Sequence, residues 1–365
     1  MVFETKASGE KVETPWTDRL VSPFLNVGLP LLSRIPASAR GLLVRGRSVS
    51  IDGNTLDPTL QLMLSAMRLV GIDGSVSQDH ATMRSQMRDI AQALPSPGLE
   101  VTARDISLPG IAGMIAARHY RPPGLAAAPL LVFYHGGGWT VGDLDTYDAL
   151  CRLMCVCAGI HVLSIDYRLA PEHPAPAAID DAYAAFQWAY EHAHELGGVP
   201  GRVAVGGDSA GGNLAAVVCQ LARDAGGPTP IFQWLVYPRT DFTAQTRSLD
   251  VFAHGFLLTK RDIDWIEAQY LGRSALDAAD PRVSPLLAES LSGLPPALIA
   301  VAGFDPLRDE GENYAAALRA AGVDVDLRYM GSLTHLFVNL FQLGGGSAAA
   351  TRELVSALRA HLSRS

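Results

Sequence analysis

The motif GDSAG at 207–211 could place a nucleophilic serine on a sharp turn. The β-branched run at 203–205 precedes this motif, and a helical pattern follows it from Asn213 onward. A strand, a tight turn with the pattern Gly-x-Ser-x-Gly and a helix together form a nucleophile elbow. The glycines leave room for neighbouring backbone, and the helix directs free N–H groups and the positive end of its dipole at the turn. Ser209 is therefore the candidate nucleophile.

A serine nucleophile needs a base, and the base needs an acid that orients it. In enzymes with this elbow, the acid and then the histidine follow the serine, each just after a strand. The apolar run 297–302 leads into a loop with Asp305, and the last strand pattern, 325–329, leads into a loop with His335. Asp305 and His335 are thus the candidate acid and base. Asp309 is an alternative acid, but it falls one turn later, where it suits a helix N-terminus.

Adjacent glycines after an apolar strand pattern could supply an oxyanion site. The strand pattern 130–134 is followed directly by HGGGW at 135–139. Side chains do not shield the N–H groups of glycines, so these groups can stabilise the negative charge of a tetrahedral intermediate. We expect Gly136 and Gly137 to donate there, together with Ala210, the residue that follows the nucleophile.

The elements that would position these residues begin after residue 98. Two alternating stretches, 99–108 and 111–120, are separated by Pro-Gly and predict a hairpin. Further strand patterns lie at 130–134, 161–165, 203–205, 232–236, 298–302 and 325–329. Helix patterns lie at 145–158, 177–194, 213–222, 310–320 and 348–361. This alternation predicts an α/β fold with a mostly parallel sheet of about eight strands and helices on both faces.

The N-terminal part has a different character. Three stretches show helical periodicity: 16–20, 60–70 and 80–94. Prolines break 23–39 into short helical pieces at best, and no convincing strand pattern is present. We expect a helical N-terminal cap at 1–98 and a catalytic domain at 99–365. Within that domain, the interval 240–294 is interpreted as an insertion that contributes to the cap and carries a helix at 260–271.

Composition restricts the partners and the compartment. The chain has 365 residues, of which 48% are hydrophobic and 18% charged, enough for one large α/β domain with an accessory part. Its formal charge of −8, without a run of Lys and Arg, argues against nucleic acid and against an electrostatic membrane anchor. The polar first 18 residues do not resemble a signal peptide. No stretch approaches the roughly 20 apolar residues of a membrane-spanning helix. We expect a cytoplasmic protein without stable membrane insertion.

The four cysteines do not suggest a disulfide framework in a chain of this length. Cys151, Cys155 and Cys157 lie close together within one helix pattern. No second cluster of Cys or His at zinc-ligand spacing accompanies them, so packing is expected rather than metal binding. The chemistry of Ser209, His335 and Asp305 requires neither a metal nor an organic cofactor.

Five longer motifs run through the catalytic part. They are HGGGW at 135–139, DYRLAPEHPAPA at 166–177, GDSAGG at 207–212, YPRTD at 237–241 and DPLRDEG at 305–311. Together they resemble the hormone-sensitive-lipase-like esterases, the bacterial family IV carboxylesterases, and the N-terminal part resembles that of mycobacterial-type members. The resemblance implies an α/β-hydrolase fold, an Asp208 that braces the elbow without transferring a proton, and a homodimer through the last strand. One departure is that Leu336 follows His335, where family members often have glycine.

We therefore expect a serine carboxylesterase that hydrolyses short- to medium-chain esters through an acyl-enzyme, with a small ester as its partner. An amide or formamide hydrolase would use the same residues and stays open. A non-catalytic small-molecule receptor is a second alternative. His335 argues against it, because the plant gibberellin receptors that resemble this family lack that histidine. A third is an interfacial lipase that would touch lipid through 20–43, although the prolines and the acidic charge favour a cap there.

Overall fold

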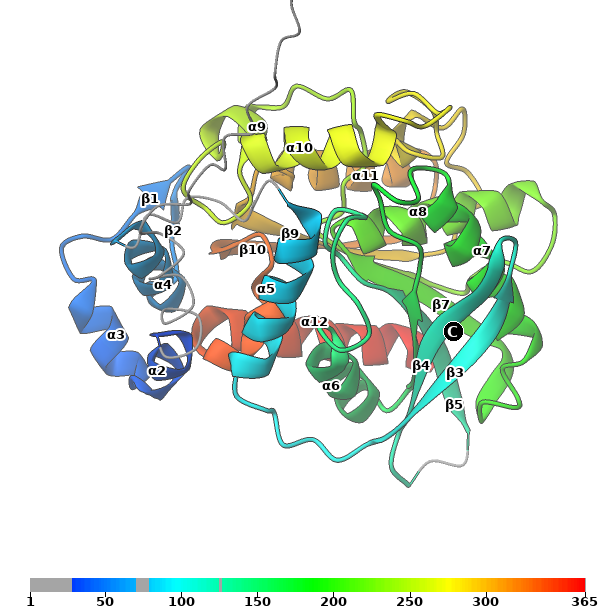
Figure 1. The fold of residues 1–365 in the computed structure, drawn as a ribbon, viewed down its shortest axis with the longest axis horizontal. Coiled ribbons are helices and arrows are strands. Elements are labelled where there is room, and N and C mark those ends of the chain that lie inside the picture. The colour runs from blue at the N-terminus through cyan, green and yellow to red at the C-terminus, as the bar shows by residue number, and fades with distance from the viewer. Residues whose placement is uncertain (1–27, 70–78, 125–126, 365) are drawn as a thin grey trace, which may run out of the picture.

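An eight-stranded sheet forms the centre of the computed structural model, which describes residues 28–69, 79–124 and 127–364 (Figure 1). The strands are β3 (Thr102–Gly110), β4 (Gly113–Arg121), β5 (Ala128–Tyr134), β6 (His161–Asp166), β7 (Gly198–Asp208), β8 (Gln233–Val236), β9 (Ala297–Phe304) and β10 (Val325–Thr334). Their order is β10-β9-β8-β7-β5-β6-β4-β3, and neighbours run parallel except at β3–β4 and β4–β6. This confirms the predicted mostly parallel α/β sheet.

Helices cover both faces of the sheet (Figure 1). One face packs against α6 (Asp148–Ala158) and α12 (Gly345–Arg364), and the other against α7 (Ala177–Glu191), α8 (Ala210–Asp224) and α11 (Arg308–Ala320). Strand β5 shows why both faces are needed. Its Leu131 and Phe133 join the first core, whereas Leu130, Val132 and Tyr134 join the second. Alternate side chains point to opposite faces, so this apolar run fills two layers.

The parallel strands end at one edge of the sheet, and their ends are in register. Tyr134 pairs with Gly207, Asp208 with Val236, and Thr334 with Phe304. The residues that follow these ends are His135, Ser209, Tyr237, Asp305 and His335. Segments that are far apart in the sequence therefore meet at this edge, which is where ligands bind in open α/β sheets.

The N-terminal part contributes α2 (Leu29–Arg34), α3 (Ala37–Leu43), α4 (Pro58–Leu69) and α5 (His80–Ala93), and the first three lie together in blue at the left of Figure 1. Three apolar residues of α4, Leu60, Met63 and Leu64, are buried in the same core as α12. The predicted helices at 60–70 and 80–94 are thus confirmed over their described residues. The predicted helix at 16–20 lies outside the described residues.

A small hairpin corrects one expectation for this part. We expected no strand before residue 99, but β1 (Ser50–Ile51) pairs antiparallel with β2 (Asn54–Thr55). The turn residues Asp52 and Gly53 have φ values of 55° and 77°, as an Asp-Gly hairpin turn requires. The Asn54 amide also donates to the Tyr329 hydroxyl of β10 at 3.0 Å. Strands of two residues are too short to produce an alternating pattern, so their periodicity could not reveal them.

The interval 240–294 contains α9 (Arg247–Val251) and α10 (Lys260–Leu271). The bounds of α10 are those predicted. At its N-terminus, Thr259 and Asp262 form a capping box, in which each side chain accepts a hydrogen bond from the other residue's N–H. This cap satisfies backbone donors that would otherwise be left free, so the helix begins at a defined residue.

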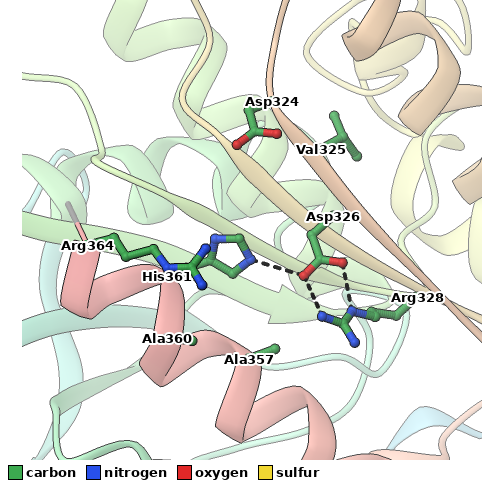
Figure 2. A pocket seen from close by; sticks show the side chains of 8 residues that line it. All are labelled: Asp324, Val325, Asp326, Arg328, Ala357, Ala360, His361 and Arg364. Atoms are coloured by element: carbon green, nitrogen blue, oxygen red, sulfur yellow. Dashed lines mark hydrogen bonds and ion pairs between the residues drawn. The ribbon is translucent and has the colours of Figure 1, made fainter.

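A charged cluster joins α12 to the start of β10 (Figure 2). Asp326 Oδ1 accepts from Arg328 Nε at 2.7 Å, and Asp326 Oδ2 accepts from Arg328 Nη2 at 2.8 Å. His361 Nε2 of α12 lies 3.0 Å from the same Oδ2. Arg328 contributes most to holding the pKa of Asp326 below its usual value. These residues line a pocket of about 310 Å³. Because His335 follows the opposite end of β10, this cluster fastens the last helix and does not belong to the strand-end edge.

Candidate active site

Ser209 lies in the turn between β7 and α8, with φ 54° and ψ −116°. A residue with a side chain rarely adopts this conformation, so neighbouring contacts must hold it. Its N–H donates to the carbonyl of Val236 at 2.8 Å. A Cβ on Gly207 would meet backbone of Tyr134 and Gly211, and a Cβ on Gly211 would meet the Tyr134 carbonyl. The two glycines are therefore required by close backbone approach, as the sequence predicted.

The structure brings Ser209, His335 and Asp305 into one chain of hydrogen bonds. Ser209 Oγ lies 2.9 Å from His335 Nε2, and His335 Nδ1 lies 2.7 Å from Asp305 Oδ2. Leu307 N–H donates to the other oxygen of Asp305 at 2.8 Å. Because a carboxylate can only accept, the imidazole carries its hydrogen on Nδ1, which leaves Nε2 free to accept from the serine. All three side chains are nearly excluded from solvent.

The alternative acid, Asp309, lies elsewhere. It occupies the first turn of α11, where it accepts from the N–H of Ser248 and from Arg308 Nε, both at 2.9 Å. An acid in that position stabilises a helix N-terminus. Asp305, rather than Asp309, is thus the carboxylate that faces His335.

Asp208 is fully buried beside the serine and joins four segments of the strand-end edge. Its Oδ1 accepts from the N–H of Gly136 at 2.8 Å. Its Oδ2 accepts from Asn339 Nδ2 at 3.0 Å, the Tyr147 hydroxyl at 3.1 Å and the Tyr237 hydroxyl at 3.3 Å. Burial raises the pKa of Asp208, and these donors act in the opposite direction. The sequence suggested a bracing role for Asp208 but missed these partners. The YPRTD motif contains Tyr237, whereas no pattern marks Tyr147 or Asn339.

The bond from Gly136 corrects the expected oxyanion site. An N–H group has one hydrogen, and that of Gly136 already goes to the Asp208 carboxylate, so our expectation that Gly136 would donate to an oxyanion was wrong. Within the described part of the chain, the N–H groups of Gly137 and Ala210 have no hydrogen-bond partner, and the same holds for Gly138. Gly137 and Gly138 have φ values of 109° and 60°, which glycine adopts without strain.

His135 supports the start of the same loop. Its ring stacks on Tyr167 at a centroid distance of 4.3 Å, and the Tyr167 hydroxyl donates to the His135 carbonyl at 2.6 Å. Burial lowers the pKa of His135 to about 4, so the ring is neutral at neutral pH. This histidine therefore braces the loop and is not placed to act as the base.

Two residues with left-handed backbone flank His335. Tyr237, with φ 37°, places its ring 4.4 Å from the imidazole. Leu336, directly after the histidine, has φ 66°. Glycine takes this conformation freely, whereas leucine is strained in it.

The described side chains can be compared with the requirements of a metal site and of a membrane span. Among the described residues, no group of three or more His, Cys, Asp and Glu could hold a metal ion. All four cysteines are unpaired, and Cys151, Cys155 and Cys219 are buried. The described helices also include none that combines the length and the apolar character needed to cross a membrane.

Comparison with known proteins identifies the family. Residues 131–339 match a family model described as alpha/beta hydrolase fold. The chain is 70% identical to Carboxylic ester hydrolase LipN of Mycobacterium tuberculosis over 96% of this chain and 94% of that protein. It is 42% identical to Esterase LipI of the same organism over 83% and 94%. A solved hyperthermophilic esterase from Pyrobaculum calidifontis has a TM-score of 0.76 and 37% identity, over 84% of this chain and 97% of that one. The chain therefore belongs to the hormone-sensitive-lipase-like carboxylesterases of the α/β-hydrolase fold.

Proposed function

We propose that this carboxylic ester hydrolase works as a serine esterase with Ser209, His335 and Asp305 as its catalytic triad. The observation that carries the proposal is the continuous path from Ser209 Oγ to His335 Nε2 at 2.9 Å and from His335 Nδ1 to Asp305 Oδ2 at 2.7 Å. A serine, a base and an orienting acid in this order are the parts that acyl transfer requires.

In the first half-reaction, His335 Nε2 accepts the serine proton as Ser209 Oγ attacks the ester carbonyl carbon. Asp305 keeps the hydrogen of the imidazole on Nδ1 and stabilises the positive charge that develops on the ring. The free N–H groups of Gly137, Gly138 and Ala210 stabilise the oxyanion of the tetrahedral intermediate. The alcohol then leaves with the proton that His335 returns to it.

In the second half-reaction, water takes the place of the alcohol. His335 removes a proton from the water, which attacks the acyl-enzyme, and a second tetrahedral intermediate forms at the same N–H groups. Its collapse releases the acid and returns the proton to Ser209 Oγ. In these two half-reactions every proton and every bond is accounted for by protein groups, ester and water, so the proposed mechanism uses no metal or organic cofactor.

For the substrate, we propose short- to medium-chain carboxylic esters that bind beneath a cap formed by 1–98 with help from 240–294. Support comes from α5, whose Arg84 donates to the carbonyls of Thr140 and Ala170 at 2.8 and 2.9 Å. This arginine fixes an N-terminal helix over two loops of the strand-end edge. A covered site excludes water and limits the length of the acyl chain.

The compartment and the assembly are proposals as well. The four unpaired thiols support a location in the cytoplasm, where the medium is reducing. Strand β10 lies at one edge of the sheet and could pair with the same strand of a second copy, which supports the homodimer.

The test compares Ser209→Ala with two substitutions of acids. Loss of a triad nucleophile typically lowers kcat by about 10⁶, whereas the fold should persist because Ser209 contributes little apolar packing. Asp305→Ala should be severe and Asp309→Ala mild, measured with p-nitrophenyl butyrate on folded protein. Treatment with diethyl p-nitrophenyl phosphate should add one diethylphosphoryl group to the wild type and none to Ser209→Ala, as intact mass would show. Activity of Ser209→Ala above about a tenth of wild type would exclude the proposed nucleophile.

A further inference from the structure

The loop that carries the free N–H groups has an unusual backbone. Three successive residues, Gly137, Gly138 and Trp139, have φ values of 109°, 60° and 55°. The two glycines adopt such angles freely, but Trp139 carries a side chain and is strained there. A strained conformation persists only where surrounding contacts determine it. The segments that make those contacts therefore help to keep the oxyanion site in place.

Helix α10, from the insertion, packs directly on this loop. The indole of Trp139 and the ring of Tyr270 are stacked with a centroid distance of 4.3 Å and an interplanar angle of 7°, and both residues are buried. One helical turn earlier, Ile266 covers Gly138 so closely that a Cβ there would lie 2.7 Å from Ile266 Cδ1 and Cγ2. Residues four apart share one face of a helix, so Ile266 and Tyr270 act on the loop together.

The same helix is fastened to the rest of the domain. Its N-terminus is fixed by the capping box of Thr259 and Asp262. Further along, Glu267 pairs with Arg239, which follows β8 and also pairs with the fully buried Glu310 of α11. The guanidinium group thus bridges two carboxylates from two helices. These contacts give α10 the rigidity that an element needs if it is to hold another segment.

The loop and α10 also share a third neighbour. Between β6 and α7, the N–H of Ala170 donates to the Trp139 carbonyl at 2.8 Å, and the N–H of Ala175 donates to the Tyr270 carbonyl at 3.0 Å. One short segment is therefore hydrogen-bonded to both members of the stacked pair. This arrangement fixes the stack from the backbone side as well as from the rings.

We propose that α10 positions the oxyanion loop, with Ile266 and Tyr270 as positioning residues for the hydrolysis of the ester. The inference rests on the proposed serine mechanism, because it assigns the N–H groups of Gly137 and Gly138 to the tetrahedral intermediate. The insertion therefore acts on the rate of the chemical step. Ile266 and Tyr270 hold in place the N–H groups that stabilise a charge which exists only in the transition state and the intermediate. The two residues should therefore affect kcat and leave substrate binding nearly unchanged.

The first experiment compares Tyr270→Ala, Tyr270→Phe and Tyr314→Ala. Tyr270→Ala removes the stacked ring, and a displacement of about 1 Å in a catalytic group can lower the rate about 100-fold. We expect kcat for p-nitrophenyl butyrate to fall about 10- to 100-fold while KM stays within about threefold. Tyr270→Phe should be close to wild type, because it keeps the ring and the hydroxyl of Tyr270 has no hydrogen-bond partner in the described structure. Tyr314→Ala is the matched control, since it removes another fully buried ring, from α11.

A second readout reports on the oxyanion itself. A trifluoromethyl ketone adds to the serine and forms a tetrahedral adduct with a negatively charged oxygen. Its inhibition constant should rise in Tyr270→Ala by the same factor by which kcat falls. A rise in KM with kcat retained would overturn the proposal and assign α10 to the substrate pocket. An equal loss of kcat in Tyr314→Ala would also overturn it, because general destabilisation would then explain both variants.

Smaller changes at Ile266 test the proposal even if Tyr270→Ala does not fold. Ile266→Val and Ile266→Ala remove increasing parts of the side chain that covers Gly138, so kcat should fall more in the second variant than in the first while KM stays within about threefold. A wild-type kcat in folded Ile266→Ala would contradict the contact that the proposal requires. Failure of the serine mechanism would look different, because Ser209→Ala would then remain active.

Discussion

Replacement of Asp208 by asparagine tests how the strand-end loops are held together. Asparagine keeps the shape of the side chain but removes its charge and one acceptor oxygen. If its carbonyl oxygen stays with the N–H of Gly136, its NH₂ group faces the NH₂ group of Asn339, which lies 3.0 Å from Oδ2 in the wild type. Two donors would then point at each other, and the hydrogen bond from Gly136 that holds the oxyanion loop would weaken.

The loss of stability expected in Asp208→Asn follows from the four donors to Asp208. A hydrogen bond to a charged group contributes about 1.5–3 kcal/mol and a neutral one about 0.5–1.5 kcal/mol, so each donor loses about 1 kcal/mol. The sum of about 4 kcal/mol is reduced because the variant no longer buries a charge, which is the effect that raises the pKa of Asp208. We expect the free energy of unfolding to fall by about 2 kcal/mol and kcat to fall about 10-fold or more.

Urea denaturation and steady-state kinetics measure these two quantities. The double variant Asp208→Asn/Asn339→Asp returns a carboxylate to the same cluster and should recover about half of the lost stability. Asp326→Asn is the control, since Asp326 is also paired, with Arg328 at 2.7 Å, but lies at the start of β10, away from the strand-end edge. It should lose stability and keep kcat. A wild-type unfolding midpoint together with a wild-type kcat in Asp208→Asn would refute the reasoning.

Two further predictions concern acid stability and the cap. Burial lowers the pKa of His119 to about 4, whereas an unfolded histidine titrates near 6.5, so the unfolded chain binds the proton first and stability falls as the pH drops from about 6.5 towards 4. His119→Asn should therefore reduce the difference in unfolding free energy between pH 7.5 and pH 5 by at most about 2 kcal/mol, and an unchanged difference would show that this histidine is not the cause. Removal of 1–35 should raise KM and broaden the acyl-chain preference more than it unfolds the sheet, because this segment is assigned to the cap. A series of p-nitrophenyl esters and a thermal melt would show this, and an unchanged profile in a folded, active protein would remove the segment from the pocket.

Several parts of the fold could be predicted because local rules agree with the tertiary structure. Helix α10 begins and ends where the sequence placed it, since Thr259 and Asp262 cap its start whatever the helix packs against. Asp305 and His335 were located from the order of strands, because the chain reaches the same edge after each parallel strand. Asp309 was set aside for its position within a helix, and the structure places it in the first turn of α11.

Other features depend on contacts that no local pattern contains. The direction of the Gly136 N–H is decided by Asp208, 72 residues further along the chain. Without that partner, all three glycines of the loop look equally suited to bind an oxyanion, and for this reason the expectation for Gly136 was wrong. Asn339 reaches the same carboxylate from beyond His335. The contact of α10 with Trp139 could not be predicted from the sequence either, because a single aromatic residue in a helix is usually an ordinary core residue.

The left-handed Leu336 has a consequence for how the enzyme responds to temperature. Glycine next to the catalytic base would allow the backbone many angles, and more of them would be visited on warming. A β-carbon restricts the backbone angles. Leucine with φ 66° therefore lowers the stability of the fold somewhat but narrows the distribution of His335 positions. The temperature range over which the base stays aligned therefore depends on a residue that takes no part in the reaction.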